Sequence, residues 1–286
     1  MSIYTPTARF DTGRPLSEVE LRKLAPSIFA VNAHESRSEK FQPICTYDVV
    51  RALENEGFGV VGAMQSNTRV EGKAPYTKHA LRIRSFKGDH KYAVGQTVFE
   101  MKLVNANDGT SPYNLLAALW RIQCMNSLVA MSQELDTVKI RHTGRDIIDR
   151  VIEGTYSVLD HAELALAAPQ DWSQIELNRD ARHALAKAAH VVRFADAEGN
   201  LNTPIEAEQL LTRRRVADTG NDLWTVFNVV QENAIRGGLV NCGPNDRGRL
   251  RRTTTRAIKG IDQDIRVNKA LFVLGQEMAS ILKQAA

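Results

Sequence analysis

Two stretches of alternating sequence, KHALRIRSF at residues 78–86 and QTVFEMKLV at 96–104, decide the fold class of this chain. In both stretches apolar side chains alternate with polar or charged ones, which is the period of a β-strand with one buried face. A shorter apolar run at 58–64 precedes them and also favours a strand. Polar, turn-like segments separate the three runs, so we expect three antiparallel strands joined by short loops.

Helical patterns come before these strands. Ser17 and Glu20 form a capping-box pair at the start of a helix that Pro26 ends. Thr46 is the expected cap of a second helix, YDVVRALENEG, whose apolar residues share one face. Gly57 stands where a glycine often follows the last helical turn. The N-terminal part therefore begins with helices and continues as a sheet.

The run at 113–135 has apolar residues on nearly every face and is buried in either conformation. Its leucine, alanine and methionine content favours a helix, with Ser111 and Pro112 as cap and first residue. A short strand is expected at 138–141, and helical patterns dominate from residue 146 onward. The predicted fold is α+β, with a small antiparallel sheet and helices in the N-terminal half and a mainly helical C-terminal half.

We divide the chain into an N-terminal arm and helix at 1–30, an α+β core at 31–145 and a helical region at 146–286. In the last region a glycine-rich basic loop at 235–260 is expected before a final helix at 266–284. Three widely spaced cysteines fit a reducing compartment. With no apolar signal core and no run of about 18 apolar residues, we expect a cytoplasmic protein.

Motifs for cofactor chemistry are missing from the sequence. No glycine-rich phosphate loop, no closely spaced pair of metal-binding histidines and no nucleophile elbow occurs. We therefore predict no nucleotide or other cofactor and no metal, and we assign no catalytic residue.

The densest local charge lies in RGRLRRTTTRAIK, residues 247–259, which contains three threonines and no acid. Arginine forks and short hydroxyls are the groups that contact phosphate oxygens, and nearby glycines let a backbone approach closely. A solvated, mobile charged loop is the alternative interpretation. The candidate DNA-binding residues of this segment are Arg247, Arg249, Arg251, Arg252, Arg256 and Lys259.

A second set of candidate DNA-binding cations lies on the strand predicted at 78–86. Lys78, Arg82 and Arg84 are an even number of residues apart, so they share one face of a strand. One face of the sheet would then present three cations to DNA, although a solvated outer face explains the same pattern. A third arginine cluster at 213–215 also suits the dipole at a helix end.

Several segments together carry a family resemblance. They are APSIFA (25–30), TKHALRIRSF (77–86), NANDGTSPYNLL (105–116), RIQCMNSLVA (121–130), RHTG (141–144) and LWTVFNVVQENAIRGG (223–238). The chain resembles the phage/plasmid-like protein family catalogued as domain of unknown function 932, over roughly residues 25–280. The resemblance implies mobile genetic elements in a bacterial cytoplasm and accessory roles near replication or recombination genes, without an established activity.

The motif residues receive no chemical role from this resemblance. The sequence leaves open the roles of residues 105–111, 124–126 and 141–144, and we expect buried structural positions for Asp108, Cys124, Asn126 and His142. Asn107 stands where the family pattern often has histidine, which argues against a catalytic or metal-binding histidine there.

The leading functional hypothesis is sequence-independent binding and annealing of single-stranded DNA without ATP. The helix, three strands and possible helix at 46–135 resemble the compact core of Red-beta/RecT-like annealing proteins. Aromatic residues, at 6%, are too few for a base-stacking platform, but an annealing protein can hold the backbone and leave the bases free to pair. Other copies of the chain, in a ring or filament, and host or phage recombination proteins are the expected partners.

Two alternatives stay open. A protein-binding accessory factor, for host takeover or against host defence, would use the basic segment on an acidic partner and carry no catalytic activity. A DNA-processing enzyme with carboxylates gathered from distant positions is the third reading.

Overall fold

The structure is a computed structural model of the 286-residue chain that divides into two compact units, Met1–Leu166 and Ala167–Ala286, here called the N-terminal and C-terminal units. The residues it describes are 14–87, 97–121, 127–128, 138–140, 142, 146–160, 162–201, 203, 205–244 and 250–285. None of the helices in these ranges is long and apolar enough to cross a membrane.

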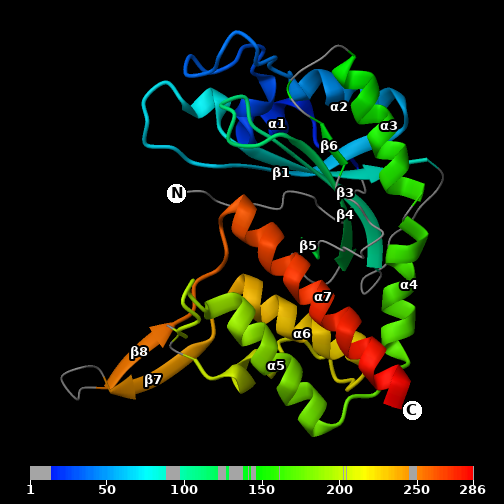
Figure 1. Ribbon diagram of the computed structural model, residues 1–286, viewed down its shortest axis with the longest axis vertical. Helices are drawn as coiled ribbons and strands as arrows, with labels where there is room; N and C mark the ends of the chain where they lie inside the picture. The colour runs from blue at the N-terminus through cyan, green and yellow to red at the C-terminus, as the bar shows by residue number, and fades with distance from the viewer. Residues whose placement is uncertain are drawn as a thin grey trace. The chain divides into compact units, whose positions relative to one another are not determined.

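An antiparallel sheet forms the centre of the N-terminal unit, with strand order β1-β2-β3-β4-β5 and with β6 paired to β4 (Figure 1). Its strands are β1 (Phe58–Gln65), β2 (His79–Ser85), β3 (Thr97–Asn105), β4 (Tyr113–Arg121), β5 (Ser127–Leu128) and β6 (Val138–Ile140). The three strands expected at 58–64, 78–86 and 96–104 are confirmed as β1, β2 and β3. The short strand expected at 138–141 is confirmed as β6.

The helix predicted for 113–135 is wrong over 113–121, which form β4, and at 127–128, which form β5. The remainder of that prediction, at 122–126 and 129–135, lies outside the described residues. Strand β4 pairs with β3 on one side and with β5 and β6 on the other. Its neighbours Leu115 and Leu116 point to opposite faces and are both buried. A strand buried on both faces shows no alternation, so its pattern resembles that of a buried helix.

The described helices of the N-terminal unit are α-helices at positions where the sequence predicts helices and two short 3-10 helices that it does not predict. They are α1 (Glu18–Leu24), α2 (Thr46–Asn55), α3 (Ile147–Asp160) and the short 3-10 helices η1 (Pro26–Phe29) and η2 (Ala74–Tyr76). The capping box of Ser17 and Glu20 is confirmed at the start of α1. The cap expected for α2 is wrong, because Cys45 occupies the N-cap and its side chain makes no capping hydrogen bond.

Helices α2 and α3 contact each other, and they pack against β1 and β4 respectively. Val49, Val50 and Leu53 of α2 are buried, as the helical pattern predicts. On α3, a side chain at Gly154 would approach Val138 to 2.7 Å, so α3 can lie close to the sheet only because this residue is glycine. The apolar core lies between these helices and the sheet.

The C-terminal unit is mainly helical, as predicted. Its helices are α5 (Arg179–Phe194), α6 (Leu223–Arg236), α7 (Ile261–Ala285) and the 3-10 helix η3 (Ala207–Leu211), together with the end of α4 (Ala162–Ser173). Trp172 of α4 forms the centre of the core, with its ring centroid 5.1 Å from that of Phe227 and 5.2 Å from that of Phe272. Gly275 of α7 makes room for this indole, since an added Cβ would lie 2.3 Å from it.

The loop predicted at 235–260 contains a two-stranded antiparallel sheet, which corrects the sequence interpretation. Strands β7 (Val240–Pro244) and β8 (Leu250–Thr254) pair from Val240 opposite Thr254 to Pro244 opposite Leu250. Valine and threonine favour this pairing, whereas the glycines and arginines around them obscure it in the sequence. Helix α7 starts earlier than the expected residue 266, with Asp262 in its first turn rather than ahead of it.

Candidate functional site

The candidate cations of the sheet, Arg82 and Arg84 on β2, are buried in an ion cluster. Glu100 of β3 lies beside them, because the register places Arg82 opposite Lys102 and Glu100 is two residues away on the same face. Arg82 donates to the Glu100 carboxylate through Nε at 2.6 Å and Nη2 at 2.8 Å. Nη2 of Arg84 donates to the same carboxylate at 2.5 Å. The side chains of Arg82 and Arg84 are each 5% exposed and that of Glu100 is 0% exposed.

This burial corrects the expectation of an exposed cationic sheet face at Arg82 and Arg84. Burial raises the pKa of Glu100, but the two guanidiniums outweigh it and hold the pKa of that carboxyl below its usual value. Lys78 lies just before β2 and is half-buried. The sequence offered one signal, the charge alternation of β3, because Lys102 lies opposite Arg82 and Glu100 lies diagonally across from it on the same face.

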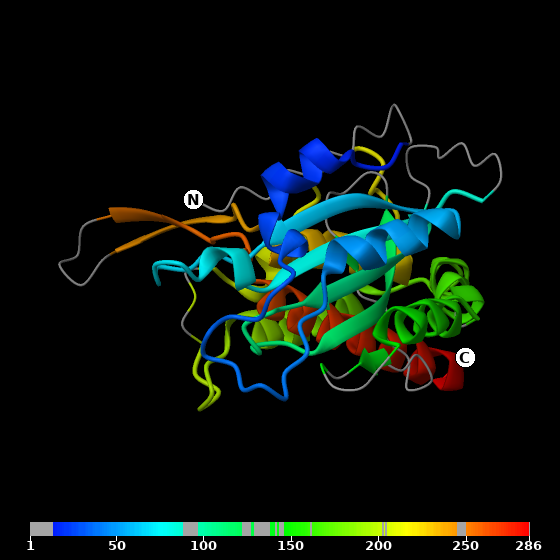
Figure 2. The ribbon, with the colours of Figure 1, turned by 90° about the horizontal axis from the view of Figure 1, so that it is seen from above.

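The second candidate set lies on the basic hairpin, by which we mean β7, β8 and the following residues 255–259. Figures 1 and 2 show its two strands extending beyond the helices of the C-terminal unit. Arg252, Arg256 and Lys259 are exposed. Within the described part of the chain, none of the three has a carboxylate within 4.0 Å.

The other three predicted hairpin cations are placed only in part. Arg251 belongs to β8 and lies opposite Gly243 of β7, whereas its side chain is outside the description. Arg247 and Arg249 lie outside the described residues. Of the six predicted cations of this segment, Arg252, Arg256 and Lys259 are therefore the ones whose side chains are described as exposed on the basic hairpin.

The base of the basic hairpin is fixed to the end of α6. The backbone N–H of Gly238 donates to the carbonyl oxygen of Thr255 at 2.8 Å, and the backbone N–H of Ile258 donates to the carbonyl oxygen of Ile235 at 2.8 Å. Gly237 has φ of 64°, and a Cβ there would lie 2.6 Å from the carbonyl carbon of Arg256. Glycine is therefore required at this position both for the backbone conformation and for the close approach.

The arginine cluster at 213–215 is largely structural. Arg215 donates to both carboxylate oxygens of Glu232, at 3.0 and 2.7 Å, and Arg236 adds a third contact to this buried acid at 3.0 Å. Arg214 donates through Nε to the side chain of Asn233 at 2.5 Å. These contacts join the segment after η3 to α6, which the helix-end interpretation of the cluster did not anticipate.

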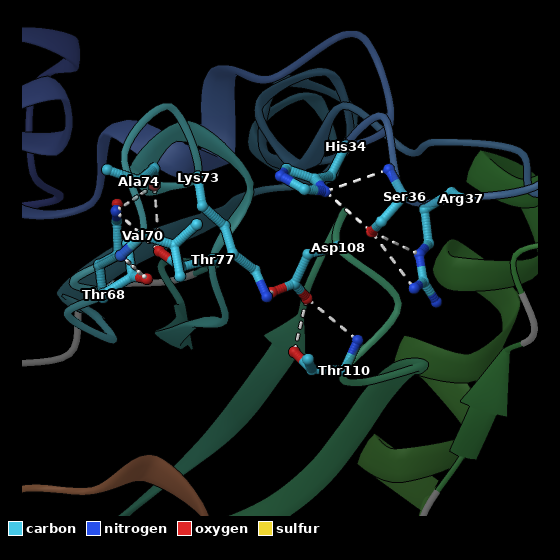
Figure 3. A network of polar contacts seen from close by, with 11 residues as sticks. His34, Ser36, Arg37, Thr68, Val70, Lys73, Ala74, Thr77, Asp108 and Thr110 are labelled. Carbon is cyan, nitrogen blue, oxygen red and sulfur yellow. Dashed lines mark hydrogen bonds and ion pairs between the residues drawn. The ribbon is translucent and has the colours of Figure 1, made fainter.

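The Asp108–Gly109 turn in the resemblance motif forms a second polar site, in the N-terminal unit (Figure 3). One carboxylate oxygen of Asp108 accepts from the Thr110 backbone at 3.0 Å and from its hydroxyl at 2.6 Å. The other oxygen pairs with Nζ of Lys73 at 3.2 Å. Burial raises the pKa of Asp108, but the hydrogen bonds from Thr110 and the charge of Lys73 outweigh it and lower the pKa.

Beside this turn, His34 and Ser36 make a histidine–serine contact of 2.8 Å (Figure 3). The backbone N–H of Ser36 donates to the same Nδ1 of His34 at 3.2 Å, which is typical of a local turn rather than of an activated nucleophile. Arg37 packs over Gly109, where an added Cβ would lie 2.4 Å from its Nη1. We therefore assign no catalytic role to this pair.

Three residues of the resemblance segments, Ser27, His79 and Asn105, form a buried polar cluster with Thr46. His79 is 0% exposed and contacts Ser27 Oγ and Thr46 Oγ1, each at 2.9 Å. Burial lowers the pKa of His79 to about 4, so the ring is neutral near pH 7. The side-chain amide of Asn105 also donates to Thr46, at 3.0 Å. The network joins η1, α2, β2 and β3.

The expected burial of the motif residues is confirmed for Asp108 and His142. His142 stacks on Phe41 with ring centroids 4.5 Å apart, and its Nδ1 is 3.1 Å from the carbonyl oxygen of Gln42. Cys124 and Asn126, as well as Arg141 and Gly144, lie outside the described residues. In the described ranges, no three histidine, cysteine, aspartate or glutamate side chains gather as metal ligands.

Comparisons with known proteins agree with the resemblance read from the motifs. UPF0380 protein YafZ and UPF0380 protein YfjQ, both of Escherichia coli (strain K12), are each 38% identical to this chain over 270 residues, which is 94% of this chain and 94% of each relative. No solved structure matches. A family model described as "Domain of unknown function (DUF932)" matches residues 33–272. The chain therefore belongs to the DUF932 family.

Proposed function

We propose that this protein binds single-stranded DNA without sequence preference, through the basic hairpin, and anneals complementary strands without ATP. The observation that carries the proposal is the exposure of Arg252, Arg256 and Lys259 without a carboxylate partner among the described residues. Cations left unpaired at a surface are available to phosphate oxygens, to which arginine can donate two parallel hydrogen bonds.

The absence of aromatic residues from β7 and β8 supports annealing rather than stable storage of a single strand. The strand sequences VNCGP and LRRTT contain no ring on which a base can stack. Contacts would then go to phosphate and leave the base edges free to pair with a second strand. The proposal places this activity in a bacterial cytoplasm and expects several copies to act along one strand.

The ion cluster of Arg82, Arg84 and Glu100 has no part in this interface. Removing a buried guanidinium from its carboxylate would leave a charge without compensation, which costs several kcal/mol. A phosphate group is already well solvated in water, so binding it would not offset the free energy lost when a buried arginine leaves Glu100. The proposal therefore depends on the C-terminal unit for its described contacts.

The test is fluorescence anisotropy with a labelled oligonucleotide over a salt series. Each phosphate contact contributes a slope of about 0.7 for single strands, so three contacts give a slope of about 2 and a loss of about 20-fold between about 50 and 200 mM salt. Replacing Arg252 and Arg256 by alanine should weaken binding equally for different sequences and lower the slope by about 1.4.

The matched control is Arg179→Ala with Lys187→Ala, which removes two exposed cations of α5 in the same unit. It should leave affinity and slope nearly unchanged if location rather than total charge determines binding. An equal loss of affinity in both double variants would mean that binding depends only on the net charge of the protein. Tighter binding to duplex than to single strands, or no acceleration of strand pairing, would contradict annealing.

A further inference from the structure

A pocket with a volume of about 370 Å³ lies within the C-terminal unit, among α5, η3, α6 and the loop before α6. Its lining combines charge and apolar surface in the way that binding sites for small organic molecules do. Arg182 comes from α5 and Arg213 from the segment after η3, whereas Val226 and Val229 come from α6. The described residues of the basic hairpin do not line this pocket.

Two guanidinium groups converge on a single oxygen of this pocket. Arg182 Nη1 donates to Oδ1 of Asn221 at 2.7 Å, and Arg213 Nη2 donates to the same oxygen at 2.9 Å. A neutral amide oxygen compensates neither charge. Neither arginine has a carboxylate within 4.0 Å among the residues that the structure describes.

Arg182 also holds an unused donor. Its Nε–H is buried and has no hydrogen-bond acceptor in the described part of the chain. A buried donor without an acceptor loses the free energy of hydration and gains nothing in return. Such a donor on a residue that lines a pocket points to a ligand that supplies the acceptor.

We propose that this pocket binds a small molecule that carries a phosphate monoester. Two adjacent guanidiniums match a dianion in charge and can hold phosphate oxygens with parallel hydrogen bonds. The apolar side chains of Val226 and Val229 form the surface for the organic part of the ligand. A free metabolite and the terminal phosphate of a nucleic acid present the same chemistry.

The nearby acid does not cancel this charge. Asp222 follows the pocket residue Asn221, and its Oδ1 accepts from the backbone of Thr225 at 2.9 Å as the cap of α6. Its carboxylate is thereby held at the helix start, where the dipole favours negative charge. The two arginines keep their charge for the pocket.

Calorimetric titration of the full chain with inorganic phosphate, phenyl phosphate and benzoate tests the proposal. Phenyl phosphate should bind one to one and at least about tenfold more tightly than benzoate, which has the same ring but a single charge. Arg213→Gln should weaken phenyl phosphate binding at least about tenfold, because it removes one of two guanidiniums from an exposed position that does not threaten the fold. Lys187→Gln, which removes an exposed cation of α5 outside the pocket, should leave binding unchanged.

Benzoate binding as tightly as phenyl phosphate, or equal binding by the wild type and Arg213→Gln, would overturn the proposal. A pair of short oligonucleotides with and without a 5′-phosphate distinguishes the two sources of the ligand. Preference for the phosphorylated one assigns the pocket to a strand end, and equal binding assigns it to free metabolites. Arg252→Ala with Arg256→Ala should leave phenyl phosphate binding intact, so a failure of the DNA proposal does not affect this result.

Discussion

The stability of the sheet should depend on pH through His79. This ring is fully buried between Ser27 and Thr46, and burial lowers its pKa to about 4. In the unfolded chain the same histidine titrates near its usual value of 6.5. Between these two values the unfolded state binds a proton that the folded state excludes, so acid favours unfolding.

The size of the effect follows from the two pKa values. At about 1.4 kcal/mol for each pKa unit, the difference corresponds to about 3 kcal/mol of unfolding free energy. The contribution of neutral His79 is complete above about pH 6.5, falls as the pH decreases and is lost near pH 4. Below that, protonation of Glu100 and Asp108, whose pKa values are lowered, adds a separate loss.

Hydrogen exchange followed by mass spectrometry measures the pH-dependent loss of stability locally, on peptides that cover β2 and β3, after correction for the intrinsic exchange rate. The wild type should lose about 2.4 kcal/mol more between pH 7 and pH 4.5 than His79→Gln, because the substitution removes the titrating group and other contributions cancel in the difference. His34→Gln, which changes a partly exposed histidine of the same unit, is the control and should keep the wild-type slope. Equal slopes for the wild type and His79→Gln would refute the neutral buried ring.

Three further changes test other parts of the structure. Glu100→Gln should destabilise the sheet by about 3–5 kcal/mol, because two buried guanidiniums lose their carboxylate, and hydrogen exchange in β2 and β3 would report it. Gly237→Ala should release the base of the basic hairpin, seen as faster exchange in 250–257, whereas Gly199→Ala, also at positive φ but with nothing within 4 Å, should cost only about 1 kcal/mol. The Tyr113 hydroxyl is buried with no hydrogen bond of normal geometry among the described residues, although Thr46 lies near it. Tyr113→Phe should therefore leave the exchange of β4 within about 1 kcal/mol of the wild type, and a larger loss would reveal a partner for this hydroxyl.

Strands β2 and β3 were predictable because apolar and polar side chains alternate along them, although the face that carries Arg82, Arg84 and Glu100 is itself buried. Strand β4 was not, because both of its faces carry apolar residues and periodicity carries no information about such a strand. The helix expected at 113–135 rested on residue preference and on Ser111 and Pro112 as cap and first residue. Over 113–121, pairing with β3 overrides that preference. The basic hairpin escaped prediction for another reason, since its strands are short and its arginines resemble those of a solvated loop.

The candidate site was predictable in charge but not in exposure. Their even spacing placed Arg82 and Arg84 on one face of a strand. Their partner Glu100 comes from the next strand, and the pairing of two strands cannot be predicted from the sequence of one strand alone. The sequence singled out Arg213 as part of the cluster at 213–215, but its pairing with Arg182 was not predictable, because the two residues are far apart in the sequence. In contrast, Arg252, Arg256 and Lys259 were predicted from local density, and the structure leaves them exposed.

A count of cations along the sequence therefore overstates the surface available to DNA. Glu100 neutralises part of the sheet cluster, and Glu232 holds Arg215 and Arg236, so these arginines stabilise the fold. The basic hairpin keeps its charge, and so does the pocket lined by Arg182 and Arg213. If both proposals hold, a strand with a 5′-phosphate would show a salt dependence with two components, one from each set of arginines. Arg252→Ala with Arg256→Ala would remove the component that is shared by all strands, and Arg213→Gln would remove only the preference for the phosphorylated end. Loss of both components in either variant would mean that the two sets of arginines form one surface in solution.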